Sequence, residues 1–243
     1  MSDSVLEVAG LRKLYGRKVA VAGVGFSMRT GEIVGLLGPN GAGKTTVFYM
    51  LAGFLHPTAG SILLDGVAID RLSMYRRARL GISYLPQEAS IFRKLTVEEN
   101  ILAVLEARGG MTSAQRRARA AGLMAEFGIE RIAGQPVYTL SGGERRRTEI
   151  ARALALEPKF LLLDEPFTGI DPIAIHEIKK IVAKLAQSGI GVLLTDHNVR
   201  DTLEITDRSY IIHLGQIIVS GDRDSILNDE DARKLYLGEE FRM

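Results

Sequence analysis

The sequence has no cysteine among its 243 residues, which excludes disulfide bonds and thiolate metal sites and fits a reducing compartment. Long apolar segments are missing too, because no uncharged apolar run approaches the roughly 20 residues needed to cross a bilayer. Residues 1–6 include Asp3 and no apolar stretch, so they do not form a signal peptide. These absences predict a soluble protein that reaches a membrane only by docking onto another chain.

Charge of one sign is scarce as well, since the formal net charge is only +2. So small an excess does not predict a nucleic-acid partner. Hydrophobic residues make up 46% and charged residues 25% of the chain, which is ordinary for a globular protein. A chain of this length can bury a complete core, and we expect one domain with a sizeable subdomain.

Short apolar runs alternate with amphipathic segments, a pattern typical of an α/β fold. Residues 33–37, 160–163 and 191–195 are apolar on both faces, as buried parallel strands are. Between the last two, Asp171 can cap a helix and Pro172 suits its first turn. Strand, helix and strand then form a βαβ unit.

The two ends of the chain have a different pattern from the middle. Strands broken by Gly and Asp are predicted at 5–9, 18–28 and 61–69, and a late hairpin at 209–214 and 216–220. Residues 96–128 are helical in pattern, with capping boxes at both helix starts. We therefore expect a mainly parallel core sheet, an antiparallel β subdomain, a helical lobe inserted at about 88–158, and a hairpin and helical tail over 209–243.

A glycine-rich loop carries the strongest chemical signal. Residues 38–45 match the pattern G-x-x-x-x-G-K-[ST] between a predicted strand and a predicted helix. Its backbone N–H groups and the helix N-terminus can surround phosphates, Lys44 can reach the β- and γ-phosphates, and Thr45 can hold Mg²⁺. The alternative, a plain turn before a helix, does not explain the full motif. The residues assigned to ATP here are Gly38, Pro39, Asn40, Gly41, Ala42, Gly43, Lys44, Thr45 and Thr46.

Two adjacent carboxylates follow the predicted strand 160–163. Ligands of open α/β sheets lie at the carboxyl ends of strands. Asp164 is therefore placed to hold Mg²⁺ through its water shell, and Glu165 to orient or deprotonate an attacking water. A solvated acid pair at a strand end is the alternative, but the phosphate-binding loop in the same chain favours the catalytic interpretation.

Three further segments resemble motifs of the ABC ATPases. Residues 140–144 read Leu-Ser-Gly-Gly-Glu and resemble the signature motif, Gln87 resembles the Q-loop glutamine, and His197 resembles the switch histidine. The order and spacing are similar to that family along nearly the whole chain. The resemblance implies the P-loop NTPase fold of ABC type, hydrolysis of ATP, and a head-to-tail homodimer in which Ser141, Gly142 and Gly143 contact the ATP of the other copy.

The resemblance also assigns roles to single residues. It implies that Gln87 touches Mg²⁺ or the attacking water, that His197 contacts the γ-phosphate, and that Tyr15 stacks on adenine. A structural histidine and a half-buried strand-end tyrosine are the alternatives. The catalytic set is then Glu165, His197, Gln87 and Lys44, and the metal set is Thr45, Gln87 and Asp164.

Two segments are less typical of the family. Residues 168–171 occupy the D-loop position, where Gly169 and Ile170 depart from the usual Ala-Leu pair and leave the loop geometry open. Residues 145–147 are three arginines after the signature. We interpret them as a solvated helix face, ahead of a contact with a partner subunit and well ahead of DNA.

Longer stretches resemble the lipopolysaccharide-export ATPases of Gram-negative bacteria, namely residues 84–96, 140–149, 163–172 and 236–243. That resemblance implies two permease partners in the inner membrane and a peripheral location on its cytoplasmic face. Other ABC transporters, such as branched-chain amino-acid importers, and non-transport ABC proteins stay open as alternatives. A partner-docking surface is expected at Ile91, Phe92 and Arg93. Alternatively, Ile91 and Phe92 pack as a staple onto the helix that begins at Thr96.

Overall fold

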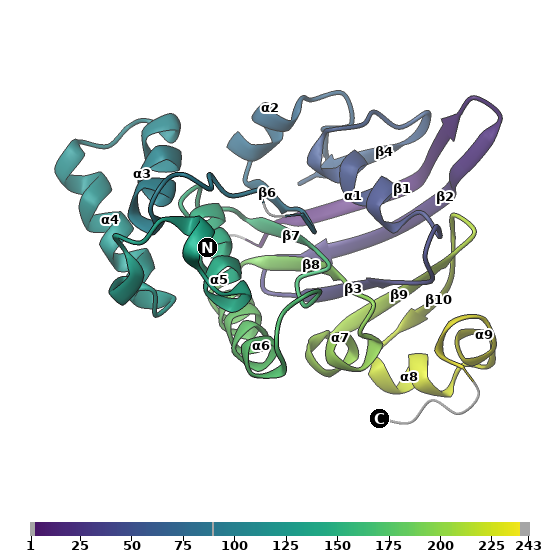
Figure 1. Cartoon of the computed structure of the whole chain (residues 1–243). Coiled ribbons are helices and arrows are strands. Elements are labelled where there is room, and N and C mark those ends of the chain that lie inside the picture. The colour runs from purple at the N-terminus through teal and green to yellow at the C-terminus, as the bar shows by residue number, and fades with distance from the viewer. Residues whose placement is uncertain (1–2, 89, 239–243) are drawn as a thin grey trace.

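The computed structural model describes residues 3–88 and 90–238. Three stretches singled out above, 1–6, 84–96 and 236–243, therefore include residues outside the described ranges, namely 1–2, 89 and 239–243. The molecule has two β-sheets, of which the larger is central and flanked by helices while the smaller lies at one side (Figure 1).

The smaller sheet is antiparallel and has four strands in the order β2-β1-β4-β5. Its strands are β1 (Val5–Tyr15), β2 (Lys18–Arg29), β4 (Ala59–Leu64) and β5 (Val67–Ala68). The first strand is longer than predicted, because an irregularity around Gly10, which has a φ of 58°, lets it go on pairing. The predicted strand 61–69 is two strands, separated by a turn at Asp65 and Gly66 with positive φ.

The larger sheet has six strands in the order β10-β9-β3-β8-β7-β6. Its strands are β3 (Ile33–Leu37), β6 (Ile82–Leu85), β7 (Phe160–Asp164), β8 (Gly191–Thr195), β9 (Arg208–His213) and β10 (Gln216–Gly221). Only β10 runs antiparallel to its neighbour. Every residue of β3, β7 and β8 is buried, which confirms the prediction of a parallel core sheet.

Helices follow the strands as the sequence pattern predicts. They are α1 (Lys44–Ala52), α2 (Met74–Arg79), α3 (Val97–Arg108), α4 (Ser113–Glu126), α5 (Gly142–Leu154), α6 (Pro172–Gln187), α7 (Val199–Ile205), α8 (Arg223–Asn228) and α9 (Glu230–Ala232), with short turns η1 (Glu130–Ile132), η2 (Val137–Thr139) and η3 (Arg233–Leu237). Thr96, Thr112 and Ser141 each begin a capping box, and Asp171 caps α6.

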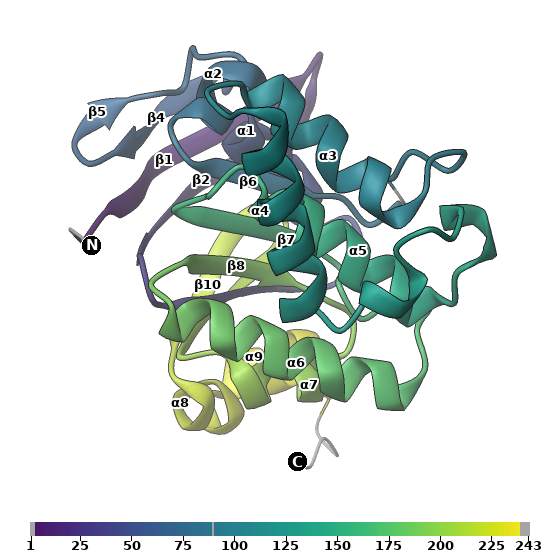
Figure 2. The same cartoon turned by 90° about the vertical axis from the view of Figure 1, so that its left-hand side faces the viewer.

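The core is arranged around the larger sheet. One apolar cluster lies between the two sheets and includes α1, while a second joins the other face of the large sheet to α3, α4, α5 and α6. Helices α3 and α4 pack together at the outer side of the molecule, next to α5 (Figure 2). No helix of the described chain has both the length and the apolar character of a membrane span.

Candidate functional site

Four parallel strands end at one edge of the large sheet, and each is followed by a motif residue. Strand β3 leads into the glycine-rich loop, β6 precedes Gln87, β7 ends in Asp164, and β8 precedes His197. Because these strands run in the same direction, their carboxyl ends share that edge. The fold therefore brings together most of the residues that the sequence predicted for the site.

The glycines of the loop are required by its geometry. A Cβ at Gly38 would lie 2.1 Å from the carbonyl oxygen of Ile212, and one at Gly43 would lie 2.7 Å from that of Ala20. Both glycines also have positive φ. Gly43 caps α1 without any side-chain hydrogen bond, so the N–H groups of the first turn are left for an anion.

Lys44 is buried and folded back on its own loop. Its Nζ donates to the carbonyl oxygens of Gly38 at 2.7 Å and Pro39 at 3.1 Å. Burial lowers the pKa of Lys44, and the carboxylates of Glu165 and Asp164 oppose that shift. The amine therefore lies within the electrostatic reach of the acid pair.

Asp164 is almost completely enclosed. Its Oδ2 accepts a hydrogen bond from the Tyr84 hydroxyl at 3.0 Å. Its Oδ1 is buried and has no hydrogen-bond partner among the described residues. Burial raises the pKa of Asp164, and it also raises the pKa of Tyr84, so the tyrosine hydroxyl is the donor in this pair.

Glu165 has an unusual backbone and a fully engaged carboxylate. Its φ of 48° is in the left-handed region, and its N–H donates to the carbonyl of Thr195 at 2.8 Å. His197 Nε2 lies 2.7 Å from one carboxylate oxygen, and the Thr168 hydroxyl donates to the other at 3.2 Å. Buried Asp196 accepts from the N–H of Phe167 at 2.8 Å, which ties the segments after β7 and β8 together.

The signature motif lies apart from the glycine-rich loop. Ser141 caps α5, and a Cβ at Gly143 would lie 2.7 Å from the Cβ of Ala174, so this helix start packs against α6. Helices α5 and α1 occupy different parts of the molecule in both views (Figures 1 and 2). No hydrogen bond or ion pair of the described chain joins residues 141–143 to residues 38–46. Tyr15 and Gln87 are exposed at the ends of β1 and β6.

The predicted docking residues behave differently from one another. Phe92 is 52% exposed and Arg93 is exposed, but Ile91 is only 5% exposed. Ile91 belongs to the core cluster that contains Val97 and Ile101. The prediction that Ile91 faces a partner is therefore wrong, because its side chain packs onto α3, in agreement with the staple alternative.

Arg146 is a second correction. It is 7% exposed and lies against the site, where it donates to the carbonyls of Pro86 at 3.2 Å and Asp164 at 3.4 Å. It also pairs with Glu149 at 3.1 Å. The interpretation of a solvated arginine face is wrong for Arg146, because α5 turns that side toward β6 and β7. The spacing to buried Ile150, four residues on, was the signal that could have shown it.

Sequence reasoning also missed the residue that fixes the loop before α3. Asn100 is completely buried, and its side chain accepts from the N–H of Phe92 at 3.0 Å and donates to the Phe92 carbonyl at 3.1 Å. It donates to the carbonyl of Thr96 at 2.9 Å as well. Its place on the face of α3 that carries Val97 and Ile101 was the available signal, since a polar residue there must find partners.

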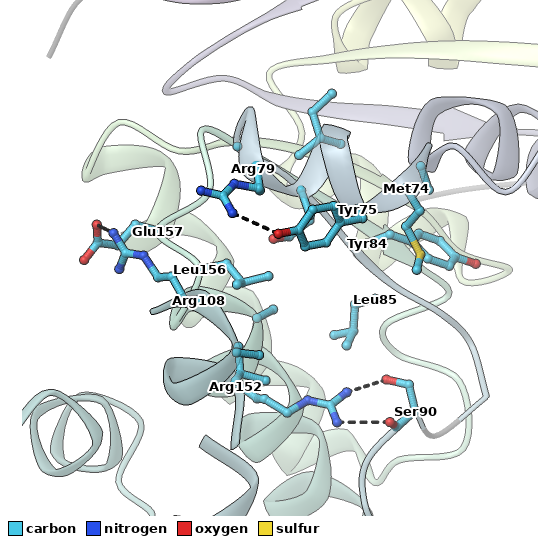
Figure 3. A pocket seen from close by; sticks show the side chains of 18 of the residues that line it. Met74, Tyr75, Arg79, Tyr84, Leu85, Ser90, Arg108, Arg152, Leu156 and Glu157 are labelled. Atoms are coloured by element: carbon cyan, nitrogen blue, oxygen red, sulfur yellow. Dashed lines mark hydrogen bonds and ion pairs between the residues drawn. The ribbon is translucent and has the colours of Figure 1, made fainter. Parts of the chain in front are cut away.

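A groove of about 1000 Å³ opens between α2, β6, α3 and α5. Apolar and aromatic side chains line much of it, and polar pairs cross its wall (Figure 3). Arg152 donates to the carbonyl and hydroxyl of Ser90, and its guanidinium lies 5.4 Å from the centre of the Phe92 ring. Arg79 donates to the Tyr75 hydroxyl.

Comparisons with known proteins agree with this geometry. The family model described as ABC transporter matches residues 21–168. The lipopolysaccharide export system ATP-binding protein LptB of Haemophilus influenzae is 53% identical over 240 residues, which cover 99% of this chain and 100% of that protein. A probable ABC transporter ATP-binding protein of Azorhizobium caulinodans is 56% identical over 245 residues, 100% of this chain and 86% of its own.

Solved structures are similar over the same extent. A dimeric ATP-binding cassette in a post-hydrolysis state, bound to ADP and phosphate, matches with a TM-score of 0.80 at 26% identity and covers 90% of this chain and 98% of its own. The sequence match, the fold and the arrangement of the glycine-rich loop, acid pair and signature lead to one conclusion. The chain belongs to the ATP-binding proteins of the ABC transporter family.

Proposed function

We propose that this chain is the ATP-hydrolysing subunit of an ABC transporter that exports lipopolysaccharide. The observation that carries the ATPase activity is the meeting of the glycine-rich loop, Lys44, the acid pair and His197 at one edge of the sheet. The cargo rests on 53% identity over nearly the whole chain to a lipopolysaccharide export system ATP-binding protein.

Nucleotide binding uses groups that the glycine-rich loop already presents. The N–H groups at the start of α1 receive the phosphates, and Lys44 exchanges its two loop carbonyls for phosphate oxygens. Exposed Tyr15 at the end of β1 is available to stack on adenine.

The donor set suits Mg²⁺. Asp164 has one buried oxygen without a partner in the described chain, and the hydroxyl of Thr45 stands next to Lys44 at the start of α1. The described residues form no group of three or more His, Cys, Asp or Glu side chains that could enclose a metal. Mg²⁺ typically binds through one or two protein oxygens, substrate phosphates and water. Thr45, Asp164 and Gln87 would hold the ion, which would neutralise charge on the phosphates.

Glu165 is the residue that orients or deprotonates the attacking water. The water oxygen forms a bond to the γ-phosphorus, the bond to the β–γ bridging oxygen breaks, and the water proton passes to Glu165 or to phosphate. His197 and Thr168 occupy both carboxylate oxygens of Glu165 in this structure. His197 must therefore leave Glu165 when it turns to the γ-phosphate, and this exchange frees one oxygen for the water.

Two copies are needed for a complete site. The signature residues Ser141, Gly142 and Gly143 lie on a helix start remote from the loop of their own chain, and a dimeric cassette is among the similar structures. In the proposed dimer these residues contact ATP held by residues 38–46 of the other copy. Closing of the dimer positions the γ-phosphate between them.

Membrane partners dock in the groove beside Phe92 and Arg93. An apolar groove of this size, lined by aromatic side chains, suits an amphipathic helix. The partners are two permease subunits, and the chain reaches the cytoplasmic face of the inner membrane through them alone. Residues 1–243 act as one ABC ATPase domain, with the helical lobe at about 88–158 and the C-terminal hairpin and tail at 209–243.

The test is to extract the tagged chain from membranes in mild detergent and identify what co-purifies. Two integral membrane proteins together with lipopolysaccharide are the expected result. Co-purification of amino-acid permeases instead would refute lipopolysaccharide as the cargo and leave the proposed ATPase activity standing. A chain recovered alone from the cytosol would overturn the transport assignment.

A further inference from the structure

Tyr84 stands between the groove and the acid pair. It lies on β6 and lines the groove (Figure 3). Phe54 is part of the same lining. Its ring contacts those of Phe54 at 5.6 Å, Tyr49 at 6.0 Å and Phe48 at 6.4 Å between centroids. Such tilted and edge-on contacts fix the plane of a ring, so the hydroxyl has a defined direction.

The other end of Tyr84 reaches the site. Its hydroxyl donates to Oδ2 of Asp164 at 3.0 Å, and it is the only side-chain donor to that carboxylate in the described chain. The bond leaves Oδ1 of Asp164 as the oxygen without a partner. The hydrogen bond from Tyr84 thus fixes which carboxylate oxygen of Asp164 is engaged and which is left for another ligand.

We propose that Tyr84 is a positioning residue through which the occupant of the groove and the acid pair act on each other. When the permease helix proposed for the groove presses on the ring, the ring and its hydroxyl shift together and draw the carboxylate of Asp164 with them. Conversely, a ligand that pulls on Asp164 moves a wall of the groove. The inference rests on the proposed role of Asp164 in holding Mg²⁺, and it adds a side chain that links this carboxylate to the groove.

A purely structural tyrosine is the competing explanation. In that case the ring fills space among Phe48, Tyr49 and Phe54, and the hydroxyl merely takes a nearby acceptor. The two explanations predict different results for a variant that lacks only the hydroxyl. A space-filling role predicts no change in metal dependence, because phenylalanine keeps the ring.

The first experiment compares Tyr84→Phe with Tyr75→Phe, a matched control whose hydroxyl lines the same groove but bonds to Arg79. Binding of a fluorescent ADP analogue is titrated with Mg²⁺ and with EDTA. In Tyr84→Phe the gain in affinity due to Mg²⁺ falls about tenfold, the loss expected for one hydrogen bond to a charged group, while binding in EDTA is unchanged. Tyr75→Phe matches the wild type in both.

An unchanged Mg²⁺ effect in Tyr84→Phe overturns the inference and leaves the proposed function standing. If Mg²⁺ does not raise the affinity of the wild type for the ADP analogue, the proposed role of Asp164 in holding Mg²⁺ is contradicted, and the inference falls with it. A loss of binding in EDTA as well identifies Tyr84 as structural only and also overturns the inference.

The second experiment detects the path from the site to the groove. The chain is labelled with 3-fluorotyrosine, and the ¹⁹F resonances of Tyr84 and Tyr75 are assigned by their loss in the two phenylalanine variants. Addition of Mg²⁺ and ADP moves the Tyr84 resonance, and it moves less when ADP is added with EDTA. A Tyr84 resonance that is the same in both conditions overturns the inference.

Discussion

At the scale of single residues, the site holds buried charge at a cost to stability. Asp164 has a raised pKa because it is buried, and one of its oxygens has no partner in the described chain. A residue whose charged form is disfavoured in the folded state lowers the free energy of unfolding near neutral pH. Stability alone therefore does not explain a buried aspartate at this position, which is in line with the metal role proposed for Asp164.

Asp164→Asn keeps an acceptor for Tyr84 and removes the charge. We expect the free energy of unfolding at pH 7 to rise by about 1 kcal/mol, in the range typical of relieving a strained functional site, while ATP hydrolysis is lost. Because the folded-state pKa is raised, acid protonates the wild type and the difference in stability shrinks as pH falls through that pKa. Urea unfolding at several pH values checks this, with Asp3→Asn as an exposed control. A variant less stable than the wild type at pH 7 would contradict it.

Glu165→Gln tests whether Glu165 acts as the general base on the attacking water. General-base catalysis typically contributes about 10²–10⁴-fold, so we expect phosphate release to fall by at least about 100-fold while ATP is still bound. The bound ATP should trap a dimer that size-exclusion chromatography detects. Glu130→Gln, in η1 away from the site, is the control. Near-normal hydrolysis in Glu165→Gln would show that Glu165 does not act as the general base.

At the scale of elements, the two ends of α1 are held by different chemistry. Its start has no side-chain cap, but its end is fixed by Arg77 of α2, which is completely buried. The guanidinium donates to the carbonyls of Met50 and Leu51 in the last turn of α1, and to those of Leu72 and Asp70. Burial lowers the pKa of Arg77 to about 10. One side chain thus satisfies helix-end carbonyls that would otherwise be orphaned.

Arg77→Met leaves these buried carbonyls without donors. We expect the free energy of unfolding to fall by about 2–6 kcal/mol, because at least two buried carbonyls lose their donor at about 1–3 kcal/mol each. Arg76→Met, at the exposed neighbouring position, should change it by less than about 0.5 kcal/mol. Chemical denaturation measures the free energy of unfolding of both variants. Equal stability of the two variants would show that α1 finds other partners for its last turn.

The same scale explains which parts of the molecule the sequence could predict. The predicted bounds of β3 and β8 match those in the structure, because a run that is apolar on both faces fits only a strand buried within the sheet. Capping boxes and the glycine-rich loop depend on neighbours in sequence, so they too could be predicted. The partner of Tyr84 could not be predicted, because it comes from another element. For Ile91 the staple alternative, and for Arg146 the spacing to Ile150, pointed to burial, but the residues that surround them could not be named from the sequence. The roles of the site residues stay predictions.

At the scale of the whole molecule, the glycine-rich loop and the signature lie at the starts of two different helices, and we propose that each is half of a composite site. Ser141→Arg should block the signature and Lys44→Ala the loop, and each variant alone should be inactive. Mixed in equal amounts, they form dimers in which one composite site is intact, so hydrolysis should recover to about one quarter of the wild-type rate by random pairing of copies. Phosphate release from the mixture measures this. No recovery above the separate variants would contradict a composite site.

The hydrogen bonds of Lys44 to its own loop have a consequence for how the loop responds to ligands. Its ammonium donates to the carbonyls of Gly38 and Pro39. A ligand that recruits Lys44 must take the place of these two acceptors, so the loss of two hydrogen bonds offsets part of the attraction between the ammonium and a phosphate. The net affinity therefore depends on the further contacts that the same ligand makes with the N–H groups at the start of α1.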